Sequence, residues 1–157
     1  MKAKVFITAL LLSANILGIY SQKDLFSKLS DNQHITSVTI TKALLNMAPA
    51  FIGNSMEGIE ISKLIGKLEQ IDIFTSEDKE TSRQMKTLIE NDIAKNKAYE
   101  TLMKIKDKTD NITFYAEKEK NSFKSLIMLI GEAEECTLIR IKGNFTAEDL
   151  QEITKNK

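Results

Sequence analysis

The chain has 157 residues, of which 42% are hydrophobic and 28% are charged, with 22 basic and 22 acidic side chains. This length allows one domain, and the composition is that of a globular protein, not a disordered or multi-span membrane protein. A single Cys and a single His exclude a disulfide framework, a multi-Cys zinc site and a clustered His site. The balanced charge gives no reason to expect nucleic acid as a partner.

The first 21 residues have the pattern of a secretory signal peptide. Two lysines precede an uncharged run over residues 5–20, and Ser21 follows before charges resume. The run is shorter and more polar than a spanning helix, which needs about 20 predominantly apolar residues. We therefore expect a signal peptide over 1–21, cleaved after Ser21, and a single domain over 22–157. The alternative is retention of the segment as an uncleaved anchor.

The first part of the remaining chain alternates between helical and strand patterns. The expected elements are helices over 24–29, 41–48 and 77–95, strands over 34–40 and 68–75, and a loop over 53–58. The second helix should end before Pro49, because the residue before a proline disfavours the α region. The third helix follows a capping-box pattern and carries a stripe of Met and aliphatic side chains.

From residue 99 the hydrophobic period changes to two, which is the period of a strand. We expect a final helix from Thr146 and, before it, four strands over 99–106, 112–117, 123–130 and 136–142. Residues 126–130 are wholly apolar, which predicts burial on both faces. The fold class is therefore α+β: one domain with a largely antiparallel sheet, two N-terminal strands plus a four-strand C-terminal meander, and helices packed mainly on one face.

Several of these segments together resemble a known family. The chain is similar to the small exported proteins of Bacteroidetes that form the domain of unknown function 4252 family. The resemblance rests on the signal-like start and on the segments VTITKALLNM (38–47), LEQIDIFTSE (68–77), YETLMKIKD (99–107), NITFYAEKEKNSFKSLIMLI (111–130) and IKGN (141–144). It implies a compact α+β fold and a location in the periplasm or at the cell surface. It implies no activity and carries over no functional residues.

The residues offer little reactive chemistry. His34 would need a partner such as Cys136 or a Ser to act in catalysis, and no motif of a hydrolase, metalloprotease or nucleotide-binding site is present. The acidic clusters lack the spacing of a calcium loop. We therefore expect no catalytic residue, no metal site and no cofactor, and we do not expect an enzyme. A hydrolase built on His34 is the least supported function.

One face of the meander is the candidate binding surface. If Met103 and Phe114 point to the core, alternation places on the opposite face Leu102, Lys104, Thr113, Tyr115, Leu126, Met128, Leu138, Arg140 and Lys142. We select Lys104, Tyr115, Met128 and Arg140 as binding residues, because an apolar centre with a Tyr and several cations suits a partner protein or an anionic amphiphile. The alternative is that other elements cover this face as ordinary core.

These observations lead to two hypotheses for function. The first is an exported, non-catalytic interaction module serving a cell-envelope or signalling assembly, with an unknown envelope protein as partner. The second is a periplasmic protein that binds a small amphiphilic ligand or a lipid. Neither involves nucleic acid, and both involve the membrane only transiently, through the signal peptide. A cavity among Met47, Met85, Met103 and Met128 would favour a ligand, and a flat exposed apolar face would favour a protein partner.

Overall fold

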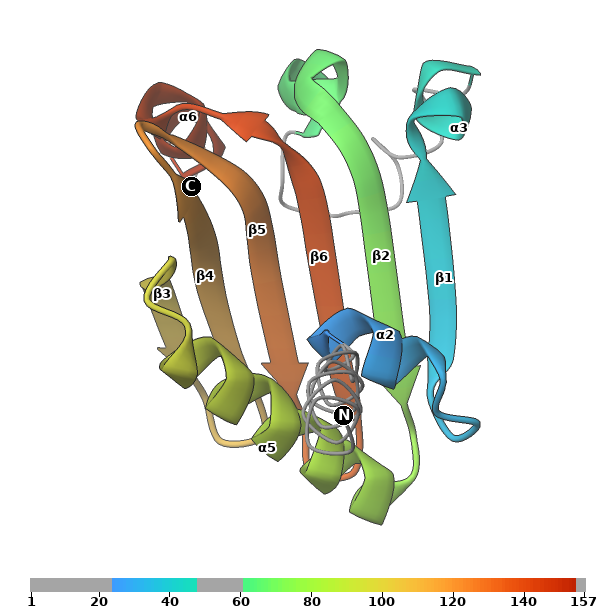
Figure 1. Cartoon of the computed structure of the whole chain (residues 1–157). Coiled ribbons are helices and arrows are strands. Elements are labelled where there is room, and N and C mark those ends of the chain that lie inside the picture. The colour runs from blue at the N-terminus through green and yellow to red at the C-terminus, as the bar shows by residue number, and fades with distance from the viewer. Residues whose placement is uncertain (1–23, 48–60, 155–157) are drawn as a thin grey trace, which may run out of the picture.

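A single antiparallel sheet of six strands organises the chain in the computed structural model, with the strand order β1-β2-β6-β5-β4-β3 (Figure 1). The structure describes residues 24–47 and 61–154, so the expected signal peptide, Pro49 and the expected loop over 53–58 lie outside the described residues. The strands are β1 (Thr36–Thr41), β2 (Leu68–Ser76), β3 (Tyr99–Lys106), β4 (Asn111–Glu119), β5 (Ser122–Gly131) and β6 (Cys136–Phe145). The expected α+β fold with a four-strand meander is confirmed.

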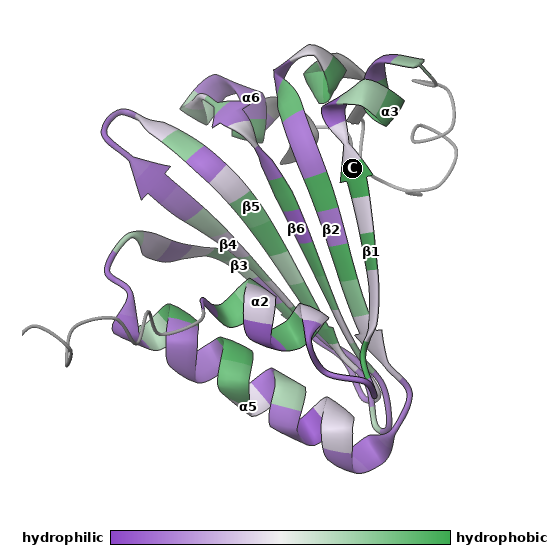
Figure 2. Cartoon of the chain, turned by 45° about the vertical axis from the view of Figure 1, so that its right-hand side comes forward, coloured by the Kyte–Doolittle hydropathy of each residue, from purple (hydrophilic) through white to green (hydrophobic). Residues whose placement is uncertain are grey.

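The helices divide between one face of the sheet and one end of it. Helices α2 (Leu25–Ser30) and α5 (Lys79–Lys95) lie along one face, as Figure 2 shows from the side. The other three lie at the end that is uppermost in Figure 1: α3 (Lys42–Met47), the 3-10 helix η1 (Ile61–Lys67) and α6 (Ala147–Thr154). None of the described helices has the length and hydrophobicity needed to span a bilayer.

Local sequence signals explain where α5 begins and which side it buries. The side chain of Asp78 accepts a hydrogen bond from the backbone N–H of Thr81 at 2.8 Å, which satisfies one of the free donors of the first turn. Met85, Ile89 and Ile93 follow at four-residue spacing, so they share one face of the helix, and all three are buried against the sheet.

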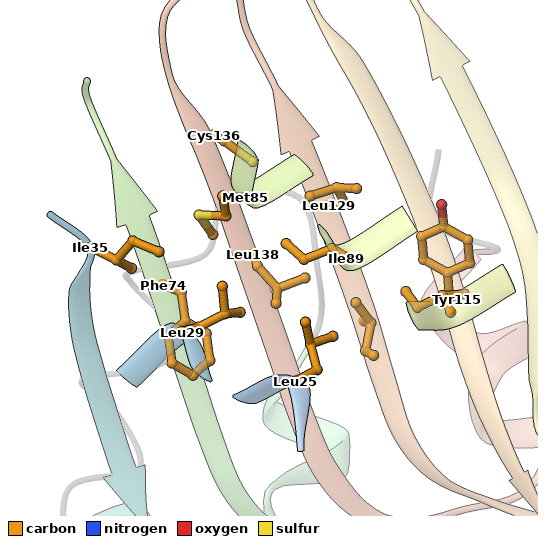
Figure 3. Close-up of a cluster of buried hydrophobic side chains, with 12 residues drawn as sticks. Leu25, Leu29, Ile35, Phe74, Met85, Ile89, Tyr115, Leu129, Cys136 and Leu138 are labelled. Carbon is orange, nitrogen blue, oxygen red and sulfur yellow. The ribbon is translucent and has the colours of Figure 1, made fainter. Parts of the chain in front are cut away.

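The main core lies between this helix layer and the sheet (Figure 3). Phe74 of β2 and Leu138 of β6 face Leu29 of α2, while Ile89 of α5 packs over the neighbouring strands. Burying each such side chain contributes about 1.5–3 kcal/mol. The full cluster of buried residues comprises Leu25, Leu29, Ile35, Phe74, Met85, Ile89, Ile93, Tyr115, Ile127, Leu129, Cys136 and Leu138.

A second, smaller core lies on the other side of the sheet, at the end where α3, η1 and α6 gather. Its buried members are Leu45, Leu64, Leu68, Ile71 and Phe145. Helix α6 is held there by a reciprocal cap, in which the N–H of Thr146 donates to Asp149 at 2.7 Å and the N–H of Asp149 donates to the Thr146 hydroxyl at 3.3 Å. Lys67 of η1 donates to the same Asp149 carboxylate, so η1 and α6 are tied together.

Candidate interaction surface

The sheet separates two of the predicted binding residues instead of bringing them together. Tyr115 pairs with Ile127, whereas its neighbour Phe114 pairs with Met128. Directly opposite residues share a face, so Tyr115 lies beneath α5 and Met128 lies on the other side. Tyr115 is 8% exposed and belongs to the main core (Figure 3). The expectation that Lys104, Tyr115, Met128 and Arg140 form one surface is therefore wrong.

Arg140 lies on the same side as Tyr115, where it is fixed by a buried ion pair. Its Nε and Nη2 atoms donate to one oxygen of Asp72, at 2.9 and 2.7 Å. The guanidinium carbon lies 3.4 Å from the centre of the Phe26 ring, which is within the range of a cation–π contact. Burial alone would raise the pKa of Asp72, but hydrogen bonds from Arg140, Gln70 and Thr39 hold that pKa below its usual value. The charge of Arg140 thus neutralises Asp72 within the fold and is not available to a ligand.

Beside Arg140 lies an open polar cleft of about 700 Å3 on the helix side of the sheet. Within the cleft, the carboxylate of Glu117 accepts a hydrogen bond from the Ser125 hydroxyl at 2.9 Å and forms an ion pair with Lys124 at 3.0 Å. Burial and the neighbouring Glu117 carboxylate raise the pKa of Tyr99 well above its ordinary value. Side chains of both signs line the cleft, and two of its three cations are already paired, Lys124 with Glu117 and Arg140 with Asp72.

Lys104 is exposed near the end of the edge strand β3. It pairs with Thr113, which places it on the side of Tyr115 and Arg140. The prediction that Lys104, Tyr115 and Arg140 share one side of the sheet is therefore correct. However, Tyr115 belongs to the main core, and Arg140 is paired with Asp72. The surface that remains available lies on the opposite side of the sheet.

That opposite side carries two uncharged rows that cross all six strands, with one residue from each strand in each row. The middle row is Val38, Ile73, Ile139, Met128, Phe114 and Met103. The lower row is Thr36, Thr75, Thr137, Ile130, Ile112 and Ile105. We call these twelve side chains the open face. Its edges are the most exposed part, with Val38 at 45% and Met103 at 40%.

Within the described residues, helices reach this side of the sheet only at its upper end. There Ile71, one row above the open face, is fully buried against the second core. Residues 126–130 were expected to be buried on both faces, and this is only half correct. Ile127 and Leu129 lie in the main core, whereas Met128 and Ile130 are half-buried on the open face. Their apolar neighbours in the same sheet shield them in part, but no described helix covers them.

Most of the open face was not predicted, because the expected binding surface depended on Phe114 and Met103 pointing to the core. A signal was present in the sequence, because both sides of β5 are apolar and only one of them can face the helix layer. Such a strand indicates a second apolar surface as readily as double burial.

The four methionines among which a cavity would favour a ligand lie apart. Met85 is in the main core, Met103 and Met128 are on the open face, and Met47 is 81% exposed on α3. No cavity therefore unites these four residues, and the described residues present an apolar sheet face instead.

The two groups considered for catalysis lie in different surroundings, Cys136 buried and His34 exposed. Burial raises the pKa of the Cys136 thiol to about 11, which suppresses the thiolate that a nucleophile needs. His34 is exposed in the turn before β1, where its backbone N–H donates to the side-chain oxygen of Asn32. In residues 24–47 and 61–154, no group of His, Cys, Asp and Glu is arranged to hold a metal ion.

Comparison with known families gives one match. A family model described as a domain of unknown function (DUF4252) matches residues 26–153, which is most of the chain. No curated protein and no solved structure matches the chain.

Proposed function

The chain belongs to this family of unknown function, and we propose from its geometry that it is a non-catalytic interaction module that docks a protein partner through the open face. The observation that carries the proposal is the middle row, in which every one of six strands contributes an apolar side chain. A sheet face that stays in contact with water gains nothing from such a row, because polar side chains would serve equally well there.

The size of the face supports a docking role. Six strands spaced about 4.8 Å apart, with side-chain rows about 6.7 Å apart, give the two rows of the open face an area of roughly 24 by 13 Å. This is about 300 Å2, which is at the lower end of the range of the apolar patches that serve as binding sites on monomeric proteins. None of its twelve side chains lines either of the two pockets described in this part of the chain, whereas a small ligand usually binds in a concave site.

The ligand-binding alternative has less support. The cleft of about 700 Å3 is lined by ion-paired polar groups such as Glu117, Lys124 and Arg140. An acyl chain or another apolar body would have to break these pairs without replacing them, which is costly at a partly buried site.

We propose further that the module is exported and acts in an assembly of the cell envelope. This part rests on the signal-peptide pattern of residues 1–21. The protein isolated from its host should have Gln22, or a residue within a few positions, as its N-terminus when its intact mass is measured. Recovery of the full-length chain in the membrane fraction would contradict cleavage.

Methionine oxidation in the host tests whether the open face is in use. Met103 and Met128 lie on the face, Met47 is an exposed control on α3, and Met85 is a buried control. Peroxide converts accessible Met to its sulfoxide, which mass spectrometry resolves for each peptide. We expect Met103 and Met128 to be oxidised much more slowly in intact cells than in the purified, dilute protein, while Met47 reacts equally in both. Equal rates for all three residues would show that the face has no partner.

A further inference from the structure

The open face has no charged member, and this restricts the kind of partner that fits it. Nine of its twelve side chains are aliphatic, aromatic or thioether groups, and the remaining three are threonines. Two of these, Thr75 and Thr137, lie 3.3 Å apart through their hydroxyl oxygens, so they satisfy each other. Partners of a different sequence are usually selected and oriented by charge complementarity, for which this face offers no group. Its best match is another flat, uncharged sheet face.

The chain supplies such a surface in its own open face. An interface that pairs the same patch on two copies is self-complementary by symmetry, so it needs no second evolved surface. Without residues 1–21 and their two lysines, 20 basic and 22 acidic side chains remain, so the small net charge of −2 on each copy repels the other only weakly. Apolar faces of twisted sheets pack about 10 Å apart, with their strands about 30° from parallel or antiparallel alignment.

The helices at the upper end fix the relative direction of the two copies. Leu45 of α3 and Leu64 of η1 pack on the open-face side of the sheet, so this end forms a step above the face. If two copies met with their strands running the same way, the two steps would collide. Reversing one copy places each step beyond the free end of the other sheet. The two-fold axis must therefore lie across the strands.

We propose that two copies of this chain associate through their open faces, with their strands antiparallel, to form a two-sheet sandwich with α2 and α5 on both outer sides. This inference rests on the proposed function and names its partner. Two faces of about 300 Å2 bury about 600 Å2 in total, which is below the size of stable specific interfaces and in the range of weak, transient ones. The dimer is therefore reversible and depends on concentration.

Sedimentation equilibrium of the processed protein, with matched edge variants, tests the proposal. Val38→Glu places a charge on the open face, and Ser37→Glu places the same charge one residue away on the other face, opposite Phe74. Met103→Glu and Thr101→Glu form a second pair on β3, because a bulge turns Met103 toward Phe114 and Thr101 toward Tyr115. All four positions are exposed, so the folded monomer tolerates each change. Circular dichroism of each variant verifies that it is folded.

We expect the parent protein to pass from monomer to dimer between about 1 and 100 μM, the range suited to an interface of minimal size. Val38→Glu and Met103→Glu should raise the dissociation constant at least about tenfold, because a charge must be desolvated in the interface. Ser37→Glu and Thr101→Glu should leave it within about twofold. A parent protein that stays monomeric over this range, or equal weakening by all four variants, overturns the proposal.

The oxidation experiment separates this inference from the proposed function. If the parent protein is monomeric but Met103 and Met128 are protected in cells, another protein or another segment of the chain occupies the face. In that case the proposed dimer is wrong, but the proposed function stands, because the open face is still covered in cells. If the protein is monomeric and both methionines are freely oxidised in cells, the proposed function fails as well.

Discussion

Replacing Arg140 with Met should strongly destabilise the protein, because Asp72 then stays buried without its cation. The Asp72 side chain is 3% exposed and that of Arg140 is 17% exposed. Removing one partner of a buried ion pair costs about 3–5 kcal/mol. Met retains an apolar contact with Phe26, so the loss reflects mainly the unpaired carboxylate. A single domain is stable by about 5–15 kcal/mol, so the variant should still fold in water.

Urea unfolding followed by circular dichroism measures this loss as a change in the free energy of unfolding. The double variant Asp72→Asn with Arg140→Met should recover at least about 2 kcal/mol of it, because a neutral amide can still bond Gln70 and Thr39. Lys124→Met is the matched control, since its ion pair with Glu117 is more exposed and should be worth less than about 1 kcal/mol. A loss below about 1 kcal/mol for Arg140→Met would refute the structural role of Arg140 and favour the binding role that the sequence analysis gave it.

Three further outcomes follow from the packing. Native protein at neutral pH should be alkylated at Cys136 only slowly, because burial raises the pKa of this thiol to about 11; rapid modification would contradict this. Gly143→Ala should cost about 1–3 kcal/mol in urea unfolding, because the new Cβ would collide with the carbonyl oxygen of Lys67, whereas Gly131→Ala meets its nearest atom at 3.5 Å and should change stability little. The lowered pKa of Asp72 stabilises the fold fully above the unfolded pKa of about 3.9, and this contribution is lost as the pH falls through the folded pKa. The free energy of unfolding should thus decline from about pH 4 downward, and less steeply in Asp72→Asn.

The sequence allowed the elements to be predicted because their periodicity is strong. The alternation of Ile112 and Phe114 with Thr113 predicted β4, and the stripe from Met85 to Ile93 predicted α5. Such local signals depend only on which side of an element is buried, which the order of apolar residues records directly.

The face to which each strand turns could not be predicted in the same way. Register shifts occur beside Leu102 and between Phe123 and Ser125, and each reverses the face that the following residues share with the neighbouring strand. Strand β5 is apolar on both faces, so the order of its residues does not show which face turns toward the helices and which belongs to the open face. The pairing of Asp72 with Arg140 joins residues 68 positions apart, and only the strand order brings them together.

Thiol accessibility of the open face tests its role as an interface most directly. Met103→Cys places a thiol on the open face and Thr101→Cys places one on the other face of the same strand, while native Cys136 is buried and unreactive. The rate of alkylation should fall for Met103→Cys as the protein concentration rises through the dissociation constant of the dimer, and it should stay constant for Thr101→Cys. If both thiols react at rates that do not depend on concentration, the open face is not an interface between two copies.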